Sequence, residues 1–278
     1  MTPTWTDDNE LAPERLGFLG WFLVVIRCVP LVGVVVVGLL IHGIIRLIER
    51  PFFGQSRPIS PIITQWVCRL GLLIIGLKLR IHGDVMNKPG AVVANHSSWL
   101  DIFVLNARKR IYFVAKSEIK GWAGIGWLAR ATGTVFIRRD RRDARQQTEV
   151  FKTRLSFGHR LLFFPEGTST DNQQVCPFKT TLFAPFLSEG IREDAHIQAV
   201  SVIYHAPKGR DPRFYGFWGN MVFGSHFLQV LGATSIGSVD VICSPAVSMM
   251  DYTNRKKLAA DLEKSVRQGF EQFSVLDR

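Results

Sequence analysis

The amino-acid sequence predicts an α/β fold in which a mixed central sheet is flanked by helices, with a membrane-embedded helical motif at the N-terminus. Short apolar runs at 91–94 and 161–164 are each followed by a polar turn, which is typical of buried strands. Residues 253–273 repeat apolar side chains at four-residue intervals, which indicates a helix packed on a core. The predominantly apolar stretch 16–48 indicates a membrane anchor.

Length and composition set the domain organisation. A chain of 278 residues can bury one substantial core, and its hydrophobic content of 47% leans toward membrane association. We therefore divide the sequence into an N-terminal tail with a membrane-anchoring helical segment, 1–57, and one globular domain, 58–278. The cysteines are widely spread without a Cys-x-x-Cys pair, so neither a zinc site nor a disulfide framework is predicted.

The apolar stretch Leu16–Ile48 exceeds the roughly 20 residues that a membrane span requires, but Arg27 and Pro30 interrupt it. An arginine at the centre of a span costs about 2.5 to 3.5 kcal/mol on insertion scales. Two arrangements relieve that cost. Either a span begins near Cys28 with Arg27 at the interface, or two shorter helices hinged near Pro30 enter one leaflet and return.

The charges around this stretch predict its orientation. The residues before it are acidic, whereas the residues before the apolar core of a signal peptide are basic. We therefore expect no cleaved signal peptide. Positive charges favour the cytoplasmic side of a membrane, and three arginines flank the C-terminal end of the stretch. We therefore expect the globular domain on the cytoplasmic side; the arginines are Arg46, Arg50 and Arg57.

Two further segments frame the sheet. Between Pro58 and Gly83, apolar side chains at helical spacing predict an amphipathic helix, and Leu79–Ile81 follows as a strand. Toward the C-terminus, Val239–Ile242 is predicted as a strand ahead of the helix at 253–273. The core-facing side chains of that helix are Leu258, Leu262, Val266 and Phe270.

The first candidate site follows the strand at 91–94. Ser97 and Ser98 are turn and N-cap residues, which predicts a helix beginning near Ser98 with His96 at the strand end and Asp101 one turn further on. A carboxylate there can fix the imidazole tautomer and leave the other nitrogen free to deprotonate a bound hydroxyl. By itself, such a histidine is more often a structural residue than a catalyst. As a catalyst, it lacks only a nucleophile, which the substrate can carry.

The second candidate site, Pro165–Ser169, follows the strand at 161–164. Ligands of open α/β sheets bind beyond the carboxyl ends of the strands, where this turn and the first one both project. Glu166 can bind a hydroxyl or a base, Gly167 lets a backbone N–H approach a ligand, and Thr168 adds a hydroxyl. The alternative is an ordinary turn.

Residues 133–139 form a third candidate, a strand that ends in Arg138 and Arg139. The planar guanidinium suits phosphate and carboxylate groups, so these two arginines are candidates for binding an anionic group. The arginines that follow interleave with aspartates and are predicted as the solvated start of a helix that continues through Val150 and Leu155. They are Arg141, Arg142 and Arg145.

Together these segments resemble the PlsC-type glycerolipid acyltransferase family, which acylates 1-acyl-glycerol-3-phosphate and related lysolipids. Asn95–Asp101 is similar to the family's Asn-His-x-x-x-x-Asp block, and Gly133–Arg139 to its Gly-x-x-Phe-Ile-Arg-Arg block. Phe164–Ser169 is similar to its Phe-Pro-Glu-Gly-Thr-Ser block, and the usual Pro-Phe-Lys follows at Pro177–Lys179. The resemblance spans about residues 80–205, with the blocks in the family's order.

The resemblance implies direct acyl transfer. His96, held by Asp101, would deprotonate a lysolipid hydroxyl as it attacks the thioester of acyl carrier protein or acyl-CoA, with oxyanion donors expected among the backbone N–H groups near His96 or Gly167. It also favours the hinged two-helix arrangement of the anchor. No metal and no cofactor besides the acyl thioester co-substrate is expected. The expected substrate-binding residues are Lys116, Arg138, Arg139, Glu166, Gly167 and Thr168.

Residues 213–232 are dense in aromatic side chains and glycine, which is more typical of core than of an acyl-binding wall. Trp218–Met221 and Val135–Arg142 resemble the lyso-ornithine-lipid branch of the family. We therefore expect a lyso-aminolipid acceptor, in lipid biosynthesis at the bacterial inner membrane. The alternatives are lysophosphatidic acid, which would yield phosphatidic acid, and, more remotely, a lipid-binding protein without activity.

The net charge of +11 predicts an acidic partner. Nucleic acid is the weakest of three candidates and is not expected as a partner, because no helix-turn-helix, zinc-finger or ribonucleoprotein pattern occurs and a membrane anchor argues against it. An anionic membrane surface attracts each nearby lysine or arginine by about 1 kcal/mol, and an acidic acyl carrier protein is the other candidate. Arg108, Lys109 and Arg110 either face such a partner or form a solvated helix end.

Other enzyme classes are not predicted, because their motifs are absent or lack the expected context. Gly124–Ala129 fits a lax dinucleotide fingerprint but follows no predicted strand. The sequence contains no Walker lysine motif, no His-Glu-x-x-His and no Gly-x-Ser-x-Gly elbow. A serine hydrolase built on His96 and Asp101 is therefore not expected.

Overall fold

The sheet at the centre of the computed structural model, which describes residues 11, 14–122, 124–138 and 144–274, has the strand order β1-β7-β6-β2-β5-β3-β4, with β8 paired to β6. The strands from β6 to β4 are mutually parallel, β1 is parallel to β7, and β7 is antiparallel to β6. The predicted mixed sheet is confirmed. The strands are β1 (Lys78–His82), β2 (Gly90–Ala94), β3 (Tyr112–Lys116), β4 (Val135–Ile137), β5 (Arg160–Phe163), β6 (His196–His205), β7 (Ser238–Cys243) and β8 (Val247–Ser248).

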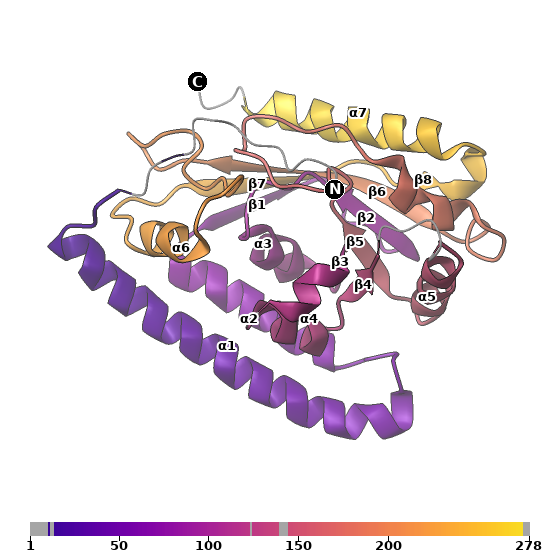
Figure 1. Ribbon diagram of the computed structural model, residues 1–278, viewed down its shortest axis with the longest axis horizontal. Coiled ribbons are helices and arrows are strands. Elements are labelled where there is room, and N and C mark those ends of the chain that lie inside the picture. Colours follow the sequence, from indigo (N-terminus) through magenta and orange to yellow (C-terminus); the bar gives the residue numbers. More distant parts are fainter. Residues whose placement is uncertain (1–10, 12–13, 123, 139–143, 275–278) are drawn as a thin grey trace.

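Helices cover both faces of the sheet. Figure 1 shows α7 on one face and α2, α3 and α6 on the other, with α1 outside them. Short 3-10 segments occupy Ser117–Gly121, Thr180–Leu187 and Met249–Asp251. The α-helices are α1 (Phe18–Phe53), α2 (Ser60–Ile75), α3 (Asp101–Arg108), α4 (Ile125–Thr132), α5 (Ala144–Ser156), α6 (Phe223–Leu231) and α7 (Arg255–Ser274).

The central strands are buried on both sides, which is why they stand out in the sequence as apolar runs. Along β2, Ala91 and Val93 belong to the core under α7, whereas Val92 and Ala94 belong to the core under α2 and α3. This alternation is the two-residue period of a strand. On the α7 side, the predicted apolar stripe of that helix is buried, as expected, at Leu258, Leu262, Val266 and Phe270.

The predicted hinge near Pro30 is wrong. Helix α1 continues through Pro30 to Phe53, and the chain reverses between Gly54 and Ile59. A proline removes one backbone hydrogen bond, and the packing of α1 along α2 tolerates this loss. The reversal is stabilised instead by the buried carboxylate of Glu49, whose Oε1 accepts the N–H of Ser60 at 2.9 Å at the start of α2.

Arg27 lies within α1, and the alternative of a span that starts beside it stays a prediction. Its guanidinium turns toward the protein, and Nη1 donates to the carbonyl oxygens of Leu231 and Ala233 at 2.7 Å each. Because the last carbonyls of a helix lack intrahelical partners, the end of α6 is a natural acceptor for this cation. The charge that interrupts the apolar sequence thus connects α1 to the end of α6.

Most of α1 faces outward. An 18-residue window of this helix has a mean hydropathy of 2.8, and only 17% of the window is buried. By length and composition α1 could cross a membrane, but it packs lengthwise along α2 (Figure 1). The domain boundary predicted at residue 57 falls in the turn between the two helices and stays a prediction.

Candidate active site

His96 and Asp101 are in direct contact. The His96 Nδ1 lies 2.7 Å from Asp101 Oδ2, with His96 just beyond the end of β2 and Asp101 at the first position of α3. Asp101 is fully buried, whereas the His96 side chain is 27% exposed. Because a carboxylate accepts hydrogen bonds, this contact places the ring proton on Nδ1 and leaves the Nε2 lone pair available.

The carboxylate of Asp101 also shapes the turn before it. Its Oδ2 accepts the N–H groups of Ser97 at 3.0 Å and Ser98 at 3.1 Å. Residues 97–100 therefore wind around Asp101, and α3 begins at Asp101 instead of near Ser98. The N–H groups of Ser97 and Ser98 already donate to this carboxylate, so neither is available to an oxyanion, and the expected oxyanion donors stay a prediction.

Glu166 holds the backbone on either side of the site. Its Oε1 accepts the N–H of His96 at 2.7 Å, and its Oε2 accepts the N–H of Cys176 at 2.6 Å. Burial raises the pKa of Glu166 to about 8, against the opposing effect of the two backbone N–H groups. The carboxyl group thus points at the chain itself, and its expected contact with a substrate stays a prediction.

The turn after Glu166 lies against the His96 backbone. The Thr170 N–H donates to the His96 carbonyl at 2.9 Å, and the Gly167 N–H donates to Phe164 at 3.2 Å. Gly167 has a φ of 75°, a left-handed conformation that suits glycine. Within the described residues, the N–H groups of Thr168 and Ser169 donate to no protein acceptor, so they replace the His96 turn as the candidate oxyanion donors.

The predicted cationic residues end neighbouring strands. Lys116 is the last residue of β3 and pairs with Ile137, the last residue of β4, so that Arg138 follows directly. Since β2, β3, β4 and β5 are parallel, both cations lie at the same edge of the sheet as His96. Arg138 is exposed, Lys116 is half-buried, and Arg139 lies outside the described residues.

The basic triplet lies at the opposite edge. Lys109 donates to the side chain of Asn87 just before β2, and Arg110 donates to the carbonyl of Pro58 at 3.2 Å in the turn between α1 and α2. Arg160, at the start of β5, donates to the Asn87 carbonyl at 2.7 Å. The cationic patch Arg108, Lys109, Arg110 and Arg160 therefore borders the hairpin of α1 and α2 and does not flank His96.

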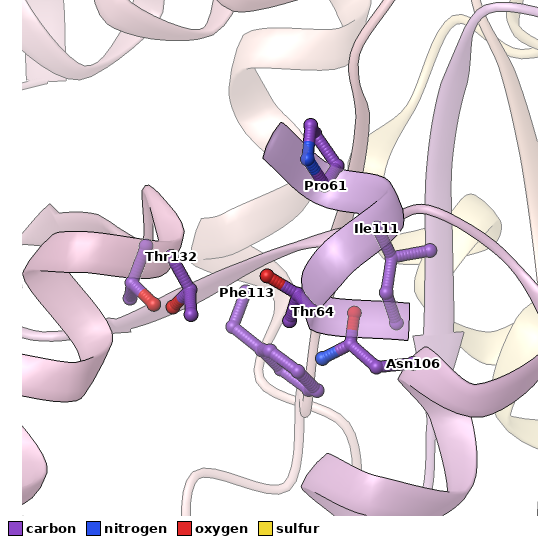
Figure 2. Close-up of a pocket in the computed structure, with 7 residues that line it drawn as sticks. Pro61, Thr64, Asn106, Ile111, Phe113 and Thr132 are labelled. Atoms are coloured by element: carbon purple, nitrogen blue, oxygen red, sulfur yellow. The ribbon is translucent and has the colours of Figure 1, made fainter. Parts of the chain in front are cut away.

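Aromatic rings separate the site from a small cavity. Phe164 stacks on His96 with ring centroids 4.1 Å apart, and Phe113 lies against Phe164 at 6.1 Å. Figure 2 shows the cavity beyond Phe113, between α2, α3 and α4. No predicted site residue lines it. Its lining residues are Pro61, Thr64, Asn106, Ile111, Phe113, Thr132 and Thr134.

Two features near the site escape sequence reasoning. Tyr204 on β6 donates its phenol proton to Asp101 Oδ1 at 2.7 Å, across 103 residues of sequence. Asn95 bridges strands, because its amide pairs with both the N–H and the carbonyl of Val202. Tyr204 lies in an apolar strand without a motif that marks it, and the motif that begins with Asn95 does not indicate which strand its side chain bonds. The aromatic segment after β6 is mainly core, as predicted, with Tyr215 and Trp218 buried.

Comparisons with known proteins identify the family of the chain. The chain matches the acyltransferase family model over residues 78–203. It is 50% identical over 273 residues to the lyso-ornithine lipid O-acyltransferase of Rhodobacter capsulatus, covering 98% of this chain and 99% of the relative. It is 33% identical to the enzyme of that name from Rhizobium meliloti, over 72% of this chain and 71% of the relative.

Similarity extends to glycerophosphate-directed enzymes. The chain is 38% identical to the 1-acyl-sn-glycerol-3-phosphate acyltransferase of Neisseria meningitidis, over 51% of this chain and 54% of the relative. The crystal structure of the 1-acyl-sn-glycerophosphate acyltransferase PlsC from Thermotoga maritima has the same fold. Its TM-score is 0.62 at 21% identity, covering 92% of this chain and 96% of that one.

Proposed function

The chain belongs to the PlsC-type acyltransferase family, on its lyso-ornithine-lipid branch, and from this premise we propose that it acylates the hydroxyl of a lyso-ornithine-type lipid. The observation that carries the proposal is the 50% identity to a lyso-ornithine lipid O-acyltransferase over almost the full length of both chains. The acyl donor is a thioester of acyl carrier protein or coenzyme A. Acceptor, donor and product all belong to bacterial membrane lipid biosynthesis.

In the proposed mechanism the substrate supplies the nucleophile. His96 Nε2 removes the proton of the acceptor hydroxyl while that oxygen attacks the thioester carbonyl, and Asp101 stabilises the imidazolium that forms. Collapse of the tetrahedral intermediate breaks the carbon–sulfur bond, and His96 returns its proton to the departing thiolate. General-base action of this kind contributes about 10²- to 10⁴-fold, so orientation and oxyanion stabilisation supply much of the remainder.

Residues at the same edge of the sheet as His96 bind the substrate. Lys116 and Arg138, with Arg139, hold the carboxylate of the amino-acid headgroup, for which a guanidinium is a matched partner. The N–H groups of Thr168 and Ser169 bind the developing oxyanion. Glu166 acts on the reaction through the backbone, because it keeps His96 and the turn that follows β5 in register.

The enzyme attaches to the cytoplasmic face of the inner membrane. The outward apolar side chains of α1 enter the leaflet, and the cationic patch beside the α1–α2 turn contacts anionic headgroups. We assign this patch to lipid instead of an acyl carrier. The thioester must arrive at His96, and the patch lies at the opposite edge of the sheet from His96. The acyl carrier therefore approaches the edge that carries Lys116 and Arg138.

A direct transfer assay tests the function. Purified protein receives labelled acyl donor, either acyl carrier protein thioester or acyl-CoA, with lyso-ornithine lipid or with lysophosphatidic acid. We expect ornithine lipid as the main product. Phosphatidic acid alone would instead support the second candidate, which the similarity to the Neisseria enzyme favours. Lipid binding without any acyl transfer would contradict an enzyme.

A further inference from the structure

Tyr204 contacts the buried side of the catalytic pair. Its phenol donates to Asp101 Oδ1 at 2.7 Å, while His96 Nδ1 and the N–H groups of Ser97 and Ser98 all converge on Oδ2. Each oxygen of the carboxylate is therefore held from a different direction. An ionised carboxylate without exposure to water needs such donors, because burying a charge without hydrogen bonds is costly.

The protein holds this phenol rigidly in place. Tyr204 is 3% exposed, and its backbone N–H and carbonyl are both bonded by the side-chain amide of Asn172 at 3.1 and 2.8 Å. Burial, followed by the charge of Asp101, raises the pKa of Tyr204 well above its usual value, so the phenol remains a hydrogen-bond donor. The tyrosine is thus a fixed, neutral donor to one carboxylate oxygen.

We propose that Tyr204 is a positioning residue for acyl transfer, which turns the Asp101 carboxylate so that Oδ2 faces His96 Nδ1. The inference rests on the proposed function of the His96 pair. Loss of the phenol leaves Oδ1 without its donor in a buried site and removes the contact that fixes the angle of the carboxylate against the imidazole. Because the Asp101 carboxylate then accepts one hydrogen bond fewer, its negative charge also attracts a protonated imidazole more strongly.

The test is Tyr204→Phe, which keeps the ring and removes the hydroxyl. Tyr215→Phe is the matched control: its ring lies 5.7 Å from that of Tyr204, but its hydroxyl accepts from Gly237. We expect Tyr204→Phe to lower kcat about tenfold with little change in either KM, since the lost bond is between a neutral donor and a charged acceptor. The control should retain kcat within about twofold.

The pH profile separates positioning from mere stability. In Tyr204→Phe, the acid limb of kcat/KM and the NMR titration midpoint of the His96 ring should both move to higher pH, whereas Tyr215→Phe should move neither. The other ionisable groups nearby are Glu166, which faces Asp101, and Tyr215, which faces Tyr204. Both are unchanged in Tyr204→Phe. An unmoved or lowered midpoint, or a loss of folded protein without a change in kcat per folded molecule, would overturn the proposal.

The NMR titration requires no substrate and no turnover. A shifted midpoint in Tyr204→Phe therefore supports the link from Tyr204 to His96 even if the acyl-transfer assay identifies another acceptor. Failure of the proposed function would instead appear as wild-type protein that forms no acylated product. The two failures are thus distinguishable.

Discussion

The His96 ring has a carboxylate on one edge, Phe164 against its face and a partly exposed Nε2 side. Three of the groups around it, Asp101, Tyr204 and Glu166, are buried and bond to the site itself. Of these four groups, His96 is therefore the one that is partly exposed. This division between a reacting group and the groups that hold it leads to two residue-scale predictions.

His96→Ala should abolish acyl transfer, with a loss of at least the 10²- to 10⁴-fold attributed to a positioned base. Membrane attachment should be unchanged, because the anchor lies on other elements. Transfer by the purified variant is measured with labelled donor, and His196→Ala at the start of β6 serves as the control. Substantial residual turnover would remove His96 from the mechanism.

Glu166→Gln should reduce both stability and kcat. A glutamine can accept with its oxygen only, so one of the N–H groups of His96 and Cys176 loses its acceptor, at a cost of about 1–3 kcal/mol. Urea unfolding in detergent and steady-state kinetics measure the two effects. If stability were unchanged and only the acceptor KM rose, Glu166 would contact the acceptor directly.

At the scale of elements, the hairpin of α1 and α2 combines an apolar outer face with cations at its turn. Exposed Phe52, Phe53 and Trp66 lie near that turn, and the cationic patch reaches it through the bond from Arg110 to Pro58. Burial lowers the pKa of Lys109, and the positive charges of Arg160, Arg110 and Arg108 add to that effect. Such a cluster attracts anions, in accord with binding to an anionic leaflet.

Arg108, Lys109 and Arg110 exchanged together for glutamine should weaken binding to vesicles that contain anionic lipid by roughly 3 kcal/mol, at about 1 kcal/mol for each charge. Binding is measured by flotation with and without anionic lipid. The control exchanges Arg255, Lys256 and Lys257 at the start of α7, on the other face of the sheet. Unchanged vesicle binding with a raised KM for acyl carrier protein would mark the patch as a carrier site.

For the molecule as a whole, two buried histidines make stability depend on pH. Burial lowers the pKa of His159 and of His226 to about 4 from the usual 6.5. Between these values the unfolded chain binds protons that the folded protein does not. The free energy of unfolding contributed by each histidine therefore falls, by about 1.4 kcal/mol per pH unit, as pH drops from 6.5 toward 4.

His226→Gln should make unfolding less dependent on pH over this window. A glutamine can accept from Trp99 and donate to Phe214, as His226 does at 2.9 and 3.1 Å, but it does not titrate. Glu166, with its raised pKa of about 8, has the opposite dependence above pH 4.5 and is common to both proteins. Urea midpoints at pH 7 and pH 5 give the comparison; an equal drop in both proteins would contradict it.

Much of the fold and part of the site follow from short-range pattern. The strand at 91–94, the turn with His96 and Asp101, and the stripe of α7 all lie within a few residues or at a regular spacing, and the structure contains each of them. The ends of elements are less predictable. Helix α3 begins three residues later than expected because the Asp101 carboxylate binds the N–H groups of Ser97 and Ser98.

The sequence by itself determined the family, the buried strands and the spacing that joins His96 to Asp101, because these depend on neighbouring residues. Only the tertiary structure placed Tyr204 on Asp101, Glu166 on the His96 backbone and Arg27 on the end of α6. These contacts join residues 103, 70 and 204 positions apart. Strand order and helix packing bring such residues together, and neither leaves a local pattern in the chain.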